Sequence, residues 1–154
     1  MKYWLMKSEP DVYSIDDLER DRNEIWDGVR NYQARNFLKS MTIGDTAFFY
    51  HSNTKPPGIA GLMTISEEMV VDPTQFDQAS KYYDPKSTPE APRWHTVTVS
   101  YVEKFAHYIS LDELKANFEP DELQVVKRGN RLSVMPITEE VAKRILSLAT
   151  EKSH

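Results

Sequence analysis

Apolar and polar side chains follow two different periods along this chain, and each period predicts one kind of element. Residues 94–105 predict a half-buried strand, because Val97, Val99 and Tyr101 fall on one face of it and Thr96, Thr98 and Ser100 on the other. Continuous apolar runs at 3–6 and 46–50 are typical of buried strands, and residues 59–71 predict one or two more. Residues 125–135 predict a β-hairpin that turns at Gly129 and Asn130.

The helical period appears in four short stretches, and each begins just after a residue that can cap a helix. Ser14, Asn31, Ser110 and Thr138 precede these stretches, and their side-chain oxygens can accept hydrogen bonds from the free N–H groups of a first turn. The second stretch runs to Met41 and the third to about residue 117. The fourth predicts a core-facing helix through an apolar stripe at Val141, Ala142, Ile145, Leu148 and Ala149.

Together these elements amount to about six strands and four short helices in mixed order, without the alternating rhythm of a parallel α/β sheet. We therefore expect a single domain over 1–154 of the α+β or mostly β class, a small closed or curved barrel flanked by short helices. Residues 72–92 are irregular, and a loop of this length inside a compact domain is usually functional or disordered. A short strand at Ile25 and Trp26 completes the prediction.

Composition narrows the class of protein. The 154 residues include no cysteine, which excludes disulfides and thiolate chemistry, and the N-terminal apolar run is too short for a signal peptide. We therefore expect a cytoplasmic protein with no membrane partner. The formal net charge of −5 argues against a broad electrostatic grip on nucleic acid, but residues 26–55 hold four basic and two acidic side chains. This local surplus suggests a confined anionic ligand.

The stretch from Trp26 to Asn36 has the most unusual composition. It combines an indole, a phenol, two guanidiniums and several amides with a single glycine, Gly28, and no acid after Asp27. Planar side chains stack on flat ligands, and arginine and amide groups match the edges of rings. Two interpretations stay open here: a pocket for a nucleobase, or a helix start in which Trp26 and Tyr32 are core residues.

The sequence shows no pattern of residues that is typical of a catalytic site. The four histidines have no metal-binding spacing, and Glu9, Asp27 and Asp45 are more typical of turns or caps than of a magnesium site. No glycine-rich phosphate loop or dinucleotide motif occurs. We therefore expect a binding protein with no metal and no cofactor, not an enzyme.

Four polar segments follow strand ends or turns and can converge at one mouth of a barrel, where ligand pockets are common. Taken singly, Ser8 and Ser133 are more typical of residues that bond the backbone. We expect Trp26 to border a cavity, and Trp4, inside an apolar strand, to fill the core. The converging segments are Ser8, residues 26–36, residues 50–52 and residues 131–133.

These motifs also resemble a known family. The runs YWLMKSEP, WDGVRNYQARNFL, GD-x-x-FFYHSN, PPGIAG, YYDPKS, PRW and RLSVMPI occur in order over nearly the whole chain and resemble those of the EVE domain family, which includes small stand-alone bacterial proteins. That family is similar to the PUA, ASCH and YTH domains, which share a β-barrel with flanking helices.

The resemblance implies a reader of modified bases in RNA or DNA, which captures a base flipped out of its stack. A monomer without cofactors is expected. By motif, the pocket residues would be Ser8, Trp26, Arg30, Asn31, Tyr32, Gln33, Tyr50, His51, Ser52 and Ser133, with Arg35 close by.

Two functions remain open at this point. One is a nucleic-acid-binding module that captures a single modified base. The other is a sensor or enzyme for a small molecule or nucleotide metabolite, which the negative net charge favours. Salt separates the two, because binding of a strand weakens with salt and binding of a free nucleoside hardly changes.

Overall fold

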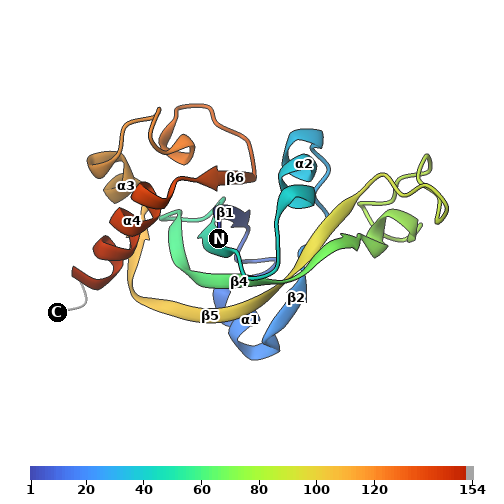
Figure 1. The fold of residues 1–154 in the computed structure, drawn as a ribbon, viewed down its shortest axis with the longest axis horizontal. Helices are drawn as coiled ribbons and strands as arrows, with labels where there is room; N and C mark the ends of the chain where they lie inside the picture. Colours follow the sequence, from blue (N-terminus) through green and yellow to red (C-terminus); the bar gives the residue numbers. More distant parts are fainter. Residues whose placement is uncertain (152–154) are drawn as a thin grey trace.

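The computed structural model describes residues 1–151 as one mixed sheet with helices packed around it (Figure 1). The strands lie in the order β2-β5-β4-β3-β1-β6, and only β1 and β3 are parallel neighbours. Their pairing brings Ser8 beside His51, so both strands end at the same edge of the sheet. The strands are β1 (Tyr3–Ser8), β2 (Asn23–Ile25), β3 (Thr46–His51), β4 (Gly58–Val71), β5 (His95–Ser110) and β6 (Val134–Ile137).

The predicted helix starts are confirmed, because each depends on residues close together in sequence. Ser14 and Asp17 form a capping box, Asn31 accepts a hydrogen bond from the Ala34 N–H, and Ser110 accepts one from the Glu113 N–H. The helices are α1 (Ile15–Asp21), α2 (Tyr32–Ser40), α3 (Leu111–Asn117) and α4 (Glu139–Glu151), with 3₁₀ turns η1 (Pro73–Phe76) and η2 (Gln124–Val126).

The sheet is covered on both faces, and alternate residues of its central strands belong to two different clusters. Leu5 and Phe48 lie in a cluster that includes residues of α3 and α4. Trp4, Met6 and Phe49 lie in a second cluster, with apolar residues of α1 and α2. Burial on both faces explains why β1 and β3 are continuous apolar runs.

Three sequence predictions need correction. The sheet is open within residues 1–151: β2 and β6 are its two edges, and α2 packs against both β5 and β6 where a closed barrel would have strand pairing. No hairpin forms at 125–135, because η2 includes its first two residues and β6 pairs with β1 instead. The strand predicted at 94–105 continues to Ser110. The α+β class and the PUA-like fold hold.

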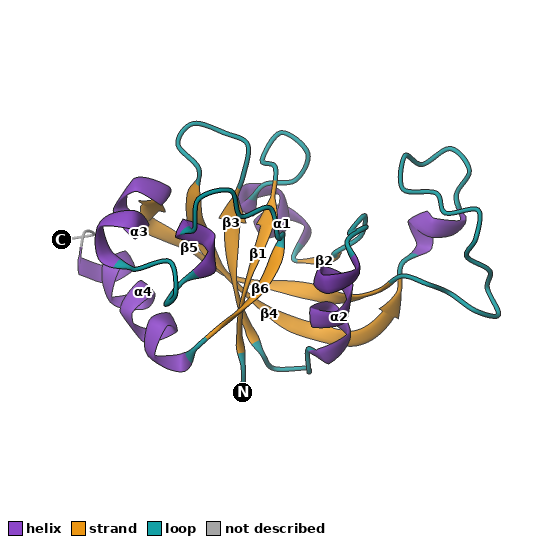
Figure 2. Ribbon diagram, turned by 90° about the horizontal axis from the view of Figure 1, so that it is seen from above, coloured by secondary structure: helices purple, strands orange, loops and turns teal. Residues whose placement is uncertain are grey.

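Residues 72–94 form a lobe that projects from the far end of β4 and β5, as two views at right angles show (Figures 1 and 2). The lobe is held by Gln75, which is fully buried. Its amide nitrogen donates to the carbonyls of Asp72 and Trp94, and its amide oxygen accepts from the Trp94 N–H. The loop is therefore ordered. Within residues 1–151, none of the helices has the length and apolar character needed to cross a membrane.

Candidate functional site

A cleft of about 910 Å³ opens where the parallel strands β1 and β3 end. Its walls come from segments far apart in sequence: the end of β1, the residues that follow β2, the lobe, and the segment that precedes β6. Five of the predicted residues line it, namely Ser8, Trp26, Arg30, Ser52 and Ser133. Trp26 and Ser133 therefore border one cavity, although more than a hundred residues separate them.

Trp26 lies at the boundary between this cleft and the core. Only 7% of its surface is exposed, and its ring packs edge-on against Phe49 with centroids 5.4 Å apart. It therefore belongs to the core as well as to the cleft, which the sequence treated as alternatives. Its main chain is fixed by strand β5, since the Trp26 N–H donates to the Val97 carbonyl.

The indole N–H of Trp26 differs from those of the other two tryptophans. Trp4 donates its indole N–H to Asp45 at 3.0 Å, and Trp94 donates to Asp84 at 2.8 Å. Trp26 donates to no group among residues 1–151, yet its nitrogen is not among the sealed, unpartnered atoms. A buried indole usually finds a partner. The free N–H is thus open to the cleft and available to a ligand.

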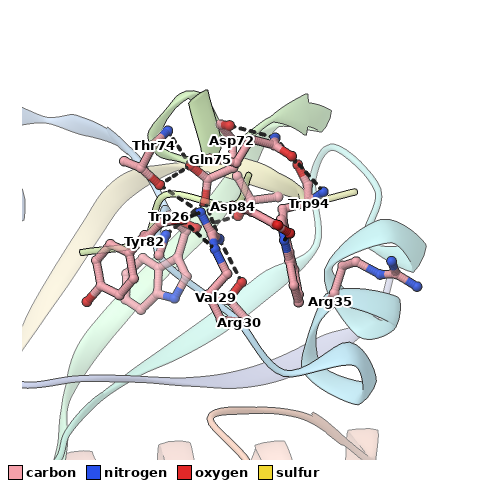
Figure 3. Close-up of polar contacts among 12 residues, drawn as sticks. Trp26, Val29, Arg30, Arg35, Asp72, Thr74, Gln75, Tyr82, Asp84 and Trp94 are labelled. Carbon is pink, nitrogen blue, oxygen red and sulfur yellow. Dashed lines mark hydrogen bonds and ion pairs between the residues drawn. The ribbon is translucent and has the colours of Figure 1, made fainter. Parts of the chain in front are cut away.

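Arg30 has a different task from the one predicted. Its guanidinium makes five hydrogen bonds, which matches its five N–H groups. Two go to the Tyr82 carbonyl, at 2.8 and 3.0 Å, and the others to Val29, Asp72 and Thr74, as Figure 3 shows. Because its donors are occupied, Arg30 fastens the lobe to the Trp26 segment and shapes the cleft without a free donor for a ligand.

Asp72 completes this attachment. Its carboxylate accepts from the Gly28 N–H at 2.8 Å, from Arg30 at 3.0 Å, and from both the N–H and the hydroxyl of Thr74. Burial alone would raise the pKa of Asp72, but these hydrogen bonds outweigh it and hold the pKa below its ordinary value. The acid is therefore held as a carboxylate.

Gly28 allows the lobe to reach the cleft wall. Its φ is +81°, and a methyl group there would lie 2.6 Å from the Tyr82 ring. Only glycine combines that backbone conformation with so close an approach. The contact places Tyr82 on the cleft wall beside the Trp26 segment, and Tyr82 and Lys81 both line the cleft.

The other predicted residues near α2 do not line the cleft. Asn31 uses its side chain as the cap of α2, and Gln33 is exposed. Tyr32 stacks on Trp94 on the outer side, with centroids 4.9 Å apart. Arg35 lies over the Tyr32 ring and donates to the Arg93 carbonyl, and Figure 3 shows its head group pointing away from the Arg30 network.

Tyr50 and His51 also lie outside this cleft. Tyr50 borders a smaller, adjoining cleft, and burial raises the pKa of its phenol to about 12. The Nε2 of His51 accepts the Ile15 N–H at 3.2 Å, at the first turn of α1. Burial lowers the pKa of His51, which favours the neutral ring that this bond requires.

Sequence reasoning missed several cleft residues. Asp27 is the most informative, because it lines the cleft and the pKa of its carboxylate is raised by partial burial and by the neighbouring charges of Asp72 and Glu24. In the sequence, only its position within the Trp26–Asn36 stretch connects Asp27 with a base-binding pocket. The remaining missed lining residues are Lys7, Glu9, Val12, Tyr13, Glu24, Ile25, Gly28, Val29, Asn53, Lys81, Tyr82, Asn130 and Arg131.

Metal chemistry finds no support in this geometry. Across residues 1–151, no three acidic, histidine or cysteine side chains gather closely enough to hold a metal ion. The cleft offers aromatic surface, an indole donor, hydroxyl groups, three carboxylates and four basic side chains. These groups suit recognition of a flat, hydrogen-bonding ligand.

The chain is similar to a known protein family and to several solved structures. A family model described as the EVE domain matches residues 2–148. Human thymocyte nuclear protein 1 is 44% identical over 164 residues, which cover 95% of this chain and 73% of that protein. A solved Pseudomonas putida structure is 48% identical with a TM-score of 0.92, covering 96% of this chain and 99% of that one.

A further solved structure with strong similarity to this chain is a complex with DNA. It is human thymocyte nuclear protein 1 in complex with DNA that contains 5-methylcytosine. It is 44% identical to this chain with a TM-score of 0.89, and the match covers 97% of this chain and 98% of that one.

Proposed function

Because this chain belongs to the EVE domain family, we propose that it is a non-catalytic nucleic-acid-binding protein that captures one modified base in its large cleft. The proposal takes residues 1–154 as one domain, monomeric and cytoplasmic. The human relative, similar over almost the whole chain, is seen with DNA containing 5-methylcytosine, so a modified cytosine in DNA is the first ligand to test.

The free indole N–H of Trp26 is the observation that carries this proposal. Trp26 is only 7% exposed, yet its indole N–H has no protein acceptor and is open to the cleft, where a ligand can accept its hydrogen bond in place of water. Its indole and the Tyr82 ring supply aromatic surface, which offsets the cost of taking a base from its stack.

Asp27 supplies the matching acceptor. An aspartate carboxylate can accept a hydrogen bond from the exocyclic amine of cytosine, whereas thymine carries a carbonyl oxygen at the same ring position. Ser8 is less available, because its hydroxyl donates to the Tyr13 carbonyl at 2.6 Å. We therefore assign Trp26 and Asp27 as the principal polar contacts of the base.

Binding of two DNA oligonucleotides that differ only in one 5-methylcytosine tests the function. We expect the methylated strand to bind more tightly, and Asp27→Asn to weaken its binding roughly tenfold, since the contact loses its charge. Asp121→Asn is the matched control, because Asp121 is exposed and lines neither cleft. Equal affinity for both oligonucleotides and for both variants would contradict the proposal.

The same titrations address the alternative of a sensor or enzyme for a small molecule or nucleotide metabolite, which the net charge of −5 favours. A protein of that kind would bind the free nucleoside as tightly as the oligonucleotide, and its affinity would hardly change with salt.

A further inference from the structure

A second cleft of about 310 Å³ adjoins the first, and whereas the first is lined by side chains of both charges, the charged side chains of the second are all basic. Lys7, Lys115, Lys127 and Arg128 line it, and no acidic residue does. Within the described residues, none of these four side chains forms an ion pair with a carboxylate. The net charge of the chain is −5, yet four unpaired cations surround this small cleft. The cleft is therefore suited to bind an anion.

Neutral donors are gathered there as well. The backbone N–H groups of Arg128 and Gly129 bond to nothing among residues 1–151, and Gly129 holds the loop in a turn with φ of +79°. The Tyr50 hydroxyl makes no hydrogen bond within the described chain and is not sealed from solvent. Its pKa of about 12 keeps it a donor at neutral pH. Such a set of donors suits the oxygens of a phosphate group.

The two clefts are continuous, because Lys7, Ser52, Asn53 and Asn130 line both. Lys7 stands at their junction, with its ammonium 5.9 Å from the centre of the Tyr50 ring. Burial lowers the pKa of Lys7, a penalty that a nearby anion would relieve. A ligand with a flat base and an adjoining phosphate would thus meet mixed charge first and positive charge next.

We propose that the second cleft is a phosphate subsite, which binds a phosphodiester of the strand whose modified base occupies the first cleft. This inference rests on the proposed function and extends it to residues outside the base-binding cleft. The base then supplies specificity, and the phosphate fixes the strand's position and direction. A free nucleotide carries the same phosphate chemistry, so the experiment must distinguish the two sources.

The test compares two double variants with the same change of charge. K127Q/R128Q removes two cations from the second cleft, and K39Q/K86Q removes two exposed cations that line neither cleft. Each is titrated with the 5-methylcytosine oligonucleotide between about 50 and 200 mM salt. The free nucleoside, 5-methyl-2′-deoxycytidine, and its 5′-monophosphate are titrated in parallel.

We expect the log–log salt slope for the oligonucleotide to become shallower by about 1 to 2 in K127Q/R128Q and to stay unchanged in K39Q/K86Q. Nucleoside affinity should be the same in all three proteins. If the oligonucleotide slope and the monophosphate affinity are both unchanged in K127Q/R128Q, while the wild type still prefers the methylated strand, the phosphate subsite alone is overturned.

Two other outcomes also decide the matter. If K127Q/R128Q weakens binding of the monophosphate but leaves the oligonucleotide slope unchanged, the second cleft binds the phosphate of a free nucleotide. The proposal that it binds a phosphodiester of a strand is then wrong. If the wild type binds neither oligonucleotide, the proposed function and this inference fail together.

Discussion

Trp4 and Trp26 lie in the same hydrophobic cluster, yet the regions around them serve different ends. The indole N–H of Trp4 is satisfied: it donates to Asp45, whose carboxylate also accepts from the N–H groups of Lys2 and Thr42. Around Trp26 the main chain is bonded but the indole N–H is free. Burial alone therefore does not separate a structural tryptophan from a binding one, whereas the partner of the indole N–H does.

The largest expected effect is the loss of either ring. Trp4 and Trp26 are 3% and 7% exposed, so Trp4→Ala and Trp26→Ala should each lower the free energy of unfolding by about 3–5 kcal/mol. Urea denaturation of both variants checks this. A cost below about 1 kcal/mol for Trp26→Ala would show that its ring fills the cleft and not the core.

A smaller loss is expected where the lobe is fastened to the sheet. Arg30→Lys replaces a fork of five bonds by one ammonium and should lower the free energy of unfolding by about 2–3 kcal/mol. Affinity should fall as well, because Tyr82 loses its anchor on the cleft wall.

Arg35→Lys is the control for that change. Arg35 is held by Arg93 and Asn36 on the outer side and lines neither cleft, so its variant should lose less than about 1 kcal/mol. Denaturation midpoints and hydrogen exchange over residues 72–94 report both variants. Equal losses for the two arginines would remove the special role of Arg30.

The smallest effect sharpens the comparison most. Trp26→Phe keeps an apolar ring but loses the indole N–H, so we expect binding to weaken about 3- to 10-fold with stability lowered by roughly 1 kcal/mol. Trp4→Phe should show the reverse: Asp45 loses a buried partner and the protein is destabilised, while affinity stays as in the wild type. Weakened binding in both variants would mean that affinity reports general loosening of the cluster.

Local chemistry explains which features the sequence could predict. The caps at Ser14, Asn31 and Ser110 bind groups three residues away, so their pattern is visible in the chain itself. The buried strands are likewise predictable, because they are continuous apolar runs in the sequence. The EVE-type motifs pointed to the family, and Trp26, Ser52 and Ser133 do border one cleft.

Long-range partners explain the rest. Arg30 looked like a ligand contact because nothing near it in sequence hints at Asp72, 42 residues away, or at the Tyr82 carbonyl. Residues 125–135 had the pattern of a hairpin, but β6 gains its partner from β1 at the other end of the chain. The prediction of a closed barrel was wrong for a similar reason. α2 packs against β5 and β6, and no local pattern in the sequence indicates this packing.

The lobe at 72–94 has a consequence for how such proteins diverge. Its own buried hub is Gln75, and it reaches the cleft through Arg30, Asp72 and the ring of Tyr82 resting on Gly28. Neither hydrophobic cluster of the sheet includes a residue from it. Substitutions at Lys81 and Tyr82 therefore alter one wall of the cleft without a cost to the core. A change of ligand preference through these two positions would leave both hydrophobic clusters of the sheet intact.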